Sequence, residues 1–256
     1  MGSLNNRKSP VGKLCRKPKA NFDKRKGDKR EMGATTNNTT CCKAVLFDLD
    51  GTLIDSYQLI LVSFRHATRA VLNRIIPDEE LMAKVGQPLS TQMWDWTDNQ
   101  EVHDELLTVY REFNHAVHDE MVSTFEGVPQ LLESLYQHNI RMGVVTSKLH
   151  WLAQRGLDCT SLANHMEVLV SPDDYPQAHK PDPGPVLYGC ELLGVAPSEC
   201  WYVGDSPFDI QAGNAAGCKT AAAAWGMFPE EQLLAQNPTI CCKTPDELQK
   251  ALVKQA

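Results

Sequence analysis

Apolar residues fall in short runs along most of the chain, and their spacing changes from one part to the next. Ala44 to Phe47 form an apolar run bounded by polar and turn residues, which is typical of a buried strand in a parallel sheet. Between residues 56 and 125 the apolar positions recur every three or four residues, which predicts helices and no strand. From Gly127 onward, helical spacing alternates with short apolar runs, and this alternation predicts βαβ units.

Turn residues divide the helical segment into four predicted helices. Asp55 stands where an N-cap is expected for the first of them. Residues 86–88, Gly-Gln-Pro, break the pattern before the third helix, which we expect to contain Trp94 and Trp96 and to bury both. The four helices are predicted at about 56–73, from 78, from 90 and at about 101–123.

The alternating part supplies the remaining elements of an α/β fold. Because parallel strands joined by helices form an open sheet with helices on both faces, we predict a doubly wound, mostly parallel, Rossmann-like sheet. Residues 43–55 and 126–256 form this core, and residues 56–125 form an inserted all-helical cap. The predicted strands of the second half are 141–146, 167–170, 200–204 and 219–223, and its helices lie at about 128–138, 148–156, 183–193, 207–216, 229–235 and 245–253.

Charge separates the first 43 residues from the rest. They carry twelve Lys and Arg against three Asp and Glu, a net of +9, whereas the remainder carries thirteen against twenty-nine, a net of −16. Residues 1–42 contain few large apolar side chains, so we expect a basic, disordered arm. Met32 is an alternative start that would leave this arm out. The acidic remainder predicts no nucleic-acid partner and suits a divalent metal.

Composition bears on whether the chain spans a membrane and on the state of its cysteines. No window approaches about 18 consecutive apolar residues, so no membrane span and no membrane partner are predicted. The nine cysteines are odd in number and include no Cys-x-x-Cys spacing, which favours reduced thiols in a cytoplasmic protein.

The first strand ends in two carboxylates. Asp48 and Asp50 are spaced i, i+2 and are followed by Gly51, which lets the backbone turn away in a conformation that other residues resist. Two acids at the mouth of a buried strand repel each other and lose hydration, so they need a cation or a proton. This pattern makes the end of the first strand the candidate site.

Polar residues also follow the other strands. Thr146, Ser147 and Lys148 follow one strand, Lys180 lies in the loop after the next, and residues 204–209 (Gly-Asp-Ser-Pro-Phe-Asp) end the fourth. The carboxyl ends of parallel strands share one edge, so these groups should meet Asp48 there. Singly, each has a plainer interpretation: Thr146 as a strand-end hydrogen bonder, Lys180 as a solvated lysine, and Asp205 as a helix N-cap.

Together these residues resemble the four motifs of the haloacid dehalogenase (HAD) superfamily of phosphohydrolases, over about residues 43–253. The resemblance implies that Asp48 is the nucleophile and Asp50 the general acid/base. It implies that Thr146, Ser147 and Lys180 bind phosphate. It also implies that Mg²⁺ is bound by Asp48, the main-chain carbonyl of Asp50 and Asp205, with Asp209 in support.

Finer similarity is to the phosphoglycolate phosphatase and pyrophosphatase branch, with a small helical cap. It implies hydrolysis of a small phosphorylated metabolite or of pyrophosphate by a monomer or homodimer. A β-phosphoglucomutase-like mutase shares the core motifs, and a non-catalytic phospho-aspartate signalling or binding module is a more distant alternative. Gly86, Arg111 and His115 are candidate substrate contacts of the cap, although His115 and His118 also suit a solvated helix face.

Overall fold

Six parallel strands form the central sheet of this protein, whose computed structural model describes residues 42–254. The strand order is β5-β4-β1-β6-β7-β8, and every neighbouring pair runs parallel. The predicted α/β, mostly parallel fold is therefore confirmed. The predicted basic arm and the alternative start at Met32 lie outside the described residues, apart from Cys42. The strands are β1 (Ala44–Phe47), β4 (Arg141–Val145), β5 (Val168–Val170), β6 (Cys200–Gly204), β7 (Lys219–Ala223) and β8 (Ile240–Cys242).

Helices cover both faces of this sheet because alternate residues of each strand point to opposite sides. Val45 and Phe47 of β1 pack with one apolar cluster, and Ala44 and Leu46 pack with another. The first cluster includes residues of α5 (Val128–Gln137), α6 (His150–Cys159) and α10 (Pro245–Val253), and the second includes residues of α7 (Gly184–Leu193) and α8 (Pro207–Ala216). The short α9 (Glu230–Leu234) packs beside α8.

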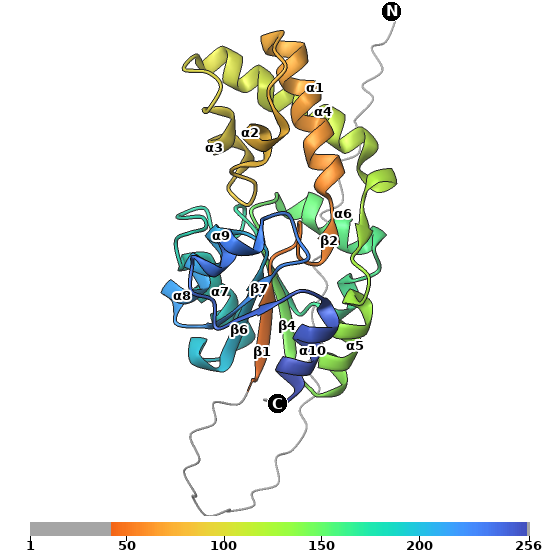
Figure 1. The fold of residues 1–256 in the computed structure, drawn as a ribbon, viewed down its shortest axis with the longest axis vertical. Helices are drawn as coiled ribbons and strands as arrows, with labels where there is room; N and C mark the ends of the chain where they lie inside the picture. The colour runs from red at the N-terminus through yellow and green to blue at the C-terminus, as the bar shows by residue number, and fades with distance from the viewer. Residues whose placement is uncertain (1–41, 255–256) are drawn as a thin grey trace, which may run out of the picture. The chain divides into compact units, whose positions relative to one another are not determined.

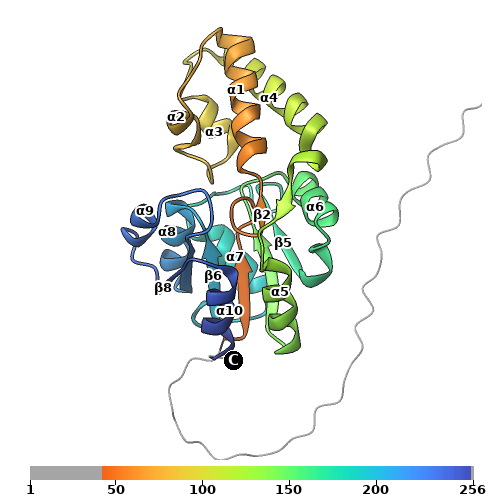
Figure 2. The same cartoon turned by 45° about the vertical axis from the view of Figure 1, so that its right-hand side comes forward.

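Four helices are inserted between β1 and α5, and we call them the cap helices. They are α1 (Tyr57–Leu72), α2 (Asp78–Met82), α3 (Leu89–Met93) and α4 (Gln100–Met121). Figures 1 and 2 show them beyond the carboxyl ends of the strands, connected by a narrow ribbon. In this connection, β2 (Ile54–Asp55) pairs with β3 (Ser123–Thr124) as two antiparallel strands. The cap helices have their own apolar cluster, which includes Phe64, Leu81, Met93 and Leu106.

Several local predictions were wrong. The prediction of no strand between residues 56 and 125 missed β3, which is only two residues long and exists through its pairing with β2. The edge strand β8 was also missed. The third cap helix ends at Met93, so it contains neither tryptophan, and Trp94 is 42% exposed. Trp96 does pack against Phe64, with ring centroids 5.3 Å apart.

Two further observations concern the helices. Ser56, not Asp55, occupies the N-cap position of α1, and no side chain caps that helix. Asp55 instead accepts a hydrogen bond from the backbone N–H of Tyr57 at 3.3 Å. Among residues 42–254, no helix combines the length and apolar character needed to cross a bilayer.

Candidate active site

Asp48 follows β1 directly and is buried against Lys180. The ammonium of Lys180 donates to Asp48 Oδ1 at 2.8 Å and to Asp209 Oδ1 at 2.6 Å. Only 4% of Asp48 and 2% of Lys180 are exposed. The two residues stand 132 positions apart in the sequence, and the parallel sheet brings them together. One buried ammonium therefore bridges two of the predicted acids.

Asp209 is fixed by a second set of donors on its other side. The hydroxyl of Tyr202 donates to its Oδ1 at 3.1 Å, and the backbone N–H and hydroxyl of Ser206 donate to its Oδ2 at 3.0 and 2.5 Å. Ser206 is also the N-cap of α8, so the alternative interpretation of Asp205 as the cap is wrong. Asp209 is completely buried, and its contacts hold it behind Lys180.

Asp205 follows β6 and lies against the turn that leaves β1. Its Oδ1 accepts from the hydroxyl of Thr52 at 3.1 Å, and its Oδ2 accepts from the backbone N–H of Met227 at 2.7 Å. Neither donor carries a charge. Burial, with repulsion from Asp209 and Asp48, raises the pKa of Asp205 well above its ordinary value. One carboxylate oxygen of each of the three acids lies within 4.8 Å of the others.

Gly51 is required where the turn passes Asp205. Its φ is +87°, in the left-handed region, and a Cβ there would stand 2.2 Å from Asp205 Oδ2. Gly226 faces the same carboxylate, and a Cβ on it would stand 2.2 Å from Asp205 Cβ. Two backbone segments without side chains thus approach Asp205 closely.

Asp50 has different partners from Asp48. Its Oδ1 accepts from the ammonium of Lys148 at 2.8 Å and from the hydroxyl of Ser56 at 2.7 Å. Burial alone would raise the pKa of Asp50, but Lys148 and Ser56 outweigh burial and hold that pKa below its ordinary value. The two acids of the first motif are therefore held by two different lysines.

The pKa of Asp48 is shifted in the opposite direction from that of Asp50. Burial raises the pKa of Asp48 to about 7 in spite of the neighbouring Lys180, and the charge of Asp209 adds to the increase. Burial disfavours the charged form of Lys180, but Asp209 and Asp48 together raise the pKa of Lys180 well above its ordinary value. The local environment thus makes the two aspartates of the first motif unequal in acidity.

The loop after β4 supplies Thr146 and Ser147. Thr146 is buried, and its hydroxyl oxygen accepts from the backbone N–H of Lys148 at 3.2 Å. The hydroxyl of Ser147 donates to the backbone carbonyl of Gly86 at 2.6 Å, between this loop and the segment that joins α2 to α3. Gly86 has a φ of +101°, and a Cβ on it would approach Ser206 Oγ to 2.9 Å. Gly86 therefore packs closely against the core.

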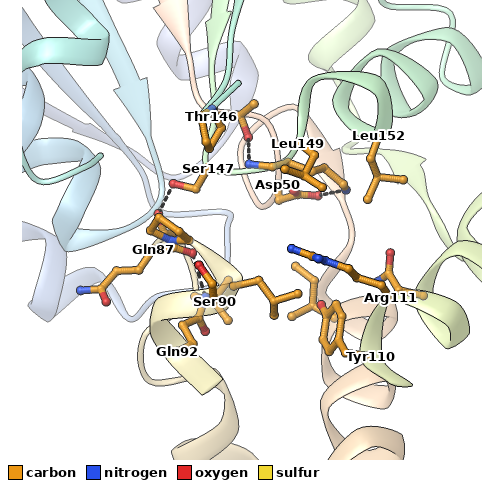
Figure 3. Close-up of a pocket in the computed structure, with 18 of the residues that line it drawn as sticks. Asp50, Gln87, Ser90, Gln92, Tyr110, Arg111, Thr146, Ser147, Leu149 and Leu152 are labelled. Atoms are coloured by element: carbon orange, nitrogen blue, oxygen red, sulfur yellow. Dashed lines mark hydrogen bonds and ion pairs between the residues drawn. The ribbon is translucent and has the colours of Figure 1, made fainter. Parts of the chain in front are cut away.

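A cavity of about 180 Å³ lies between the cap helices and this edge of the sheet. Figure 3 shows Arg111 reaching into it from α4, on the side opposite Gln87 and Ser147. The guanidinium of Arg111 forms no hydrogen bond or ion pair with residues 42–254. The other polar lining residues include Asp48, Asp50, Thr146, Lys148, Gln92, Asn114 and His115, and the apolar ones include Ile60, Phe64, Val85, Leu89, Leu149 and Leu152.

The structure brings together all the predicted site residues. Asp48, Lys180, Asp205 and Asp209 form one cluster of contacts, whereas Asp50, Thr146, Ser147, Gly86, Arg111 and His115 line the cavity beside it. The expectation of a solvated face for His118 was wrong, because that side chain is completely buried.

The sequence does not identify which side chains hold the acids. The position of Lys148 two residues after Thr146 predicts a second lysine at this edge but does not assign it to Asp50. Ser56 donates to Asp50 and Tyr202 donates to Asp209. No local pattern identified these two, since their roles depend on contacts made by the fold.

Comparisons with known proteins agree with this architecture. A family model described as haloacid dehalogenase-like hydrolase matches residues 45–223. The pyrophosphatase PpaX of Bacillus velezensis is 38% identical over 195 residues, which cover 76% of this chain and 89% of that protein. The pyrophosphatase PpaX of Bacillus pumilus is 36% identical over 211 residues, which cover 82% of this chain and 96% of that protein.

Solved structures share the fold at lower identity. A protein from Haemophilus somnus, described as a predicted phosphoglycolate phosphatase, is 23% identical with a TM-score of 0.75, and the match covers 82% of this chain and 97% of that one. A hydrolase from Pseudomonas syringae is 22% identical with a TM-score of 0.75, and the match covers 84% of this chain and 99% of that one.

Proposed function

This chain belongs to the haloacid dehalogenase-like hydrolase family and is a phosphatase-type hydrolase, and we propose that it is a Mg²⁺-dependent enzyme that cleaves a small phosphate ester or anhydride. The observation that carries the proposal is the buried cluster of Asp48, Lys180, Asp205 and Asp209 beside a cavity that Asp50 also lines. This set combines a nucleophile, a phosphate-binding cation and a group that can transfer protons.

The donor set fits a divalent cation. Three buried carboxylates, those of Asp48, Asp205 and Asp209, face one ammonium within the cluster, that of Lys180, which is too little positive charge for three ionised acids. Mg²⁺ prefers hard oxygen ligands, including few carboxylates together with substrate phosphate and water. We assign Asp48, Asp205 and the main-chain carbonyl of Asp50 to the metal, with Asp209 in support. When bound, Mg²⁺ would neutralise charge on the phosphate oxygens.

In the first half of the proposed reaction, Asp48 acts as the nucleophile. Its carboxylate oxygen attacks phosphorus, the bond from phosphorus to the leaving oxygen breaks, and an aspartyl-phosphate forms. Lys180 and Thr146 hold phosphate oxygens during this step, one by charge and one by its hydroxyl. Ser147 contributes a further hydroxyl at the same edge.

Asp50 transfers protons in both halves. Its ionised carboxylate first takes up a proton from solvent and passes it to the leaving oxygen in the first half. In the second half the carboxylate removes a proton from the water that attacks the aspartyl-phosphate and frees Asp48. Lys148 and Ser56 orient the carboxyl group of Asp50 on the cavity side of the site. The cap helices enclose the cavity, exclude bulk water and contact the leaving group.

Two substrates lead the proposal. Relatives named pyrophosphatase support inorganic pyrophosphate. The resemblance of the motifs to the phosphoglycolate phosphatase branch supports a carboxylated phosphate ester. The guanidinium of Arg111, which has no partner among residues 42–254, suits an anionic leaving group in either case. The apolar wall adds affinity only for a leaving group with carbon atoms.

The test combines one variant with a substrate panel. Asp48→Asn keeps the size of the side chain but removes the nucleophilic carboxylate, so Mg²⁺-dependent phosphate release should disappear while the circular dichroism spectrum is unchanged. Wild-type turnover in Asp48→Asn would contradict the mechanism. The panel should contain pyrophosphate, phosphoglycolate, sugar phosphates and a chromogenic phosphomonoester, each with Mg²⁺ and with a chelator. Isomerisation of a sugar phosphate without phosphate release would establish the mutase alternative instead.

A further inference from the structure

Three cysteine thiols meet on the opposite side of the fold from the cavity. Cys190 lies on α7, Cys200 is the first residue of β6, and Cys218 directly precedes β7. Their sulfur atoms all lie within 4.8 Å of one another, and Cys190 Sγ stands 3.9 Å from Cys218 Sγ. The residues are 1%, 0% and 8% exposed. Three elements whose cysteines lie within 28 positions of one another thus direct three thiols to one buried point.

The distance between two of these sulfurs, those of Cys190 and Cys218, fits a metal site. Metal–sulfur bonds to Zn²⁺ are about 2.3 Å long, so two thiolates bound to one ion at tetrahedral or trigonal angles stand about 3.8–4.0 Å apart. The distance of 3.9 Å between Cys190 Sγ and Cys218 Sγ falls in this range. A disulfide would need these sulfurs at about 2.05 Å, which requires movement of α7 or of the turn before β7.

The surroundings of the thiols select the kind of ion. They lie in an apolar cluster with Ala44, Val186, Leu193 and Ala216, and the group of potential ligands contains no carboxylate or histidine. Soft thiolate ligands select soft cations over Mg²⁺. We propose that Cys190, Cys200 and Cys218 form a three-thiolate site for a soft d¹⁰ cation of the Zn²⁺ class.

This site is separate from the proposed active site. Cys200 begins β6 and Gly204 ends it, so the thiols lie about 13 Å along the strand from the start of the Asp205 loop. Figure 1 shows the beginning of β1, which runs parallel to β6, at the end of the sheet away from the cap helices. A bound ion would join α7, β6 and the start of β7, and so stabilise the fold without entering the reaction.

Cadmium is the probe for the test because thiolate-to-cadmium charge transfer absorbs in the ultraviolet and carboxylate ligands give no such band. The full-length, reduced wild-type protein should bind one Cd²⁺ with this absorption, and X-ray absorption should find three sulfur ligands. Zn²⁺ should raise the Tm of the metal-free protein and Cd²⁺ should displace that Zn²⁺ with growth of the band, whereas excess Mg²⁺ should displace neither ion. A wild-type protein that gives no charge-transfer band with one equivalent of Cd²⁺ would refute the site.

Variants assign the ligands. Cys200→Ala keeps a small apolar side chain in the cluster, and loss of a direct ligand should weaken Cd²⁺ binding by about 100-fold or more. The control Cys159→Ala changes an exposed cysteine and should leave binding unchanged. Wild-type affinity in Cys200→Ala would overturn the proposal, as would loss of the band in Cys241→Ala. Cys200→Ala should keep Mg²⁺-dependent phosphate release, because the acidic cluster is untouched. The two proposals can therefore fail separately.

Discussion

The ammonium of Lys148 donates a hydrogen bond to Asp50 Oδ1 at 2.8 Å, although the two residues stand 98 positions apart. Asp48 is held by a different lysine, Lys180, at the same distance. The proposed nucleophile and the proposed proton-transfer group thus have separate cationic partners. Each carboxylate can therefore be perturbed through its own lysine.

Lys148→Met should disable Asp50 and leave Asp48 in place. The variant removes the charge that holds Asp50, so proton transfer loses its orientation and kcat should fall by about 100-fold or more. Steady-state kinetics with a chromogenic phosphomonoester measure this loss. Lys84→Met is the matched control, because Lys84 is an exposed cap lysine that pairs with Asp95. Equal kcat values in the two variants would show that the contact from Lys148 to Asp50 is not used.

Gly51→Ala should affect both stability and activity. A non-glycine residue in the left-handed region costs about 1–2 kcal/mol, and the new Cβ would also collide with Asp205. Gly217→Ala imposes a similar backbone conformation, φ +78°, with nothing within 4 Å of the added Cβ. Urea denaturation should show a larger loss of unfolding free energy for Gly51→Ala than for Gly217→Ala, and only Gly51→Ala should lose phosphate release. Equal losses in both variants would remove the role assigned to the close approach of Gly51 and Asp205.

Arg111→Leu tests recognition of the leaving group. Hydrogen bonds to a charged group contribute about 1.5–3 kcal/mol, so KM for an anionic substrate should rise about 10- to 100-fold. KM for a substrate with an uncharged leaving group should stay near the wild-type value. Arg69→Leu, an exposed arginine on α1, is the control. An unchanged KM for pyrophosphate and phosphoglycolate in Arg111→Leu would place the substrate elsewhere in the cavity.

Acid should weaken the contacts of Asp174, which lies in the segment that follows β5. Asp174 Oδ2 accepts from the Ser171 hydroxyl and from His150 Nδ1, both at 2.6 Å. Burial would raise the pKa of Asp174, but these donors outweigh burial and lower it below the ordinary value of 3.8. Because the folded pKa lies below the unfolded one, the stabilisation is present above the unfolded pKa and is lost as the pH falls through the folded pKa.

The measurement for Asp174 is urea denaturation of wild type and Asp174→Asn between neutral and acidic pH. Wild type should be the more stable protein at neutral pH, and the difference should shrink as the pH falls below about 4. A difference that grows on acidification would have the wrong sign for a depressed carboxyl pKa.

Local sequence was sufficient for much of the fold and for the composition of the site. Apolar runs such as Ala44–Phe47 identified central strands because a strand buried on both faces must be apolar throughout. Because the strands are parallel, the polar residues that follow β1, β4 and β6 lie at the same edge of the sheet. The predictions failed for short elements such as β3, whose two residues form a strand only because β2 lies beside them. Division of the chain into core and cap at residues 55 and 125, the roles of the site residues and a cytoplasmic location stay predictions.

The sequence by itself determined which acids, hydroxyls and lysines stand at strand ends, because hydrophobic periodicity is a local property. Tertiary structure alone decided that Lys180 bridges Asp48 and Asp209, that Lys148 holds Asp50, and that three cysteine sulfurs meet within 4.8 Å. The physical reason is that such contacts depend on the packing of helices and loops between residues far apart in the chain, and no spacing in the sequence encodes those distances.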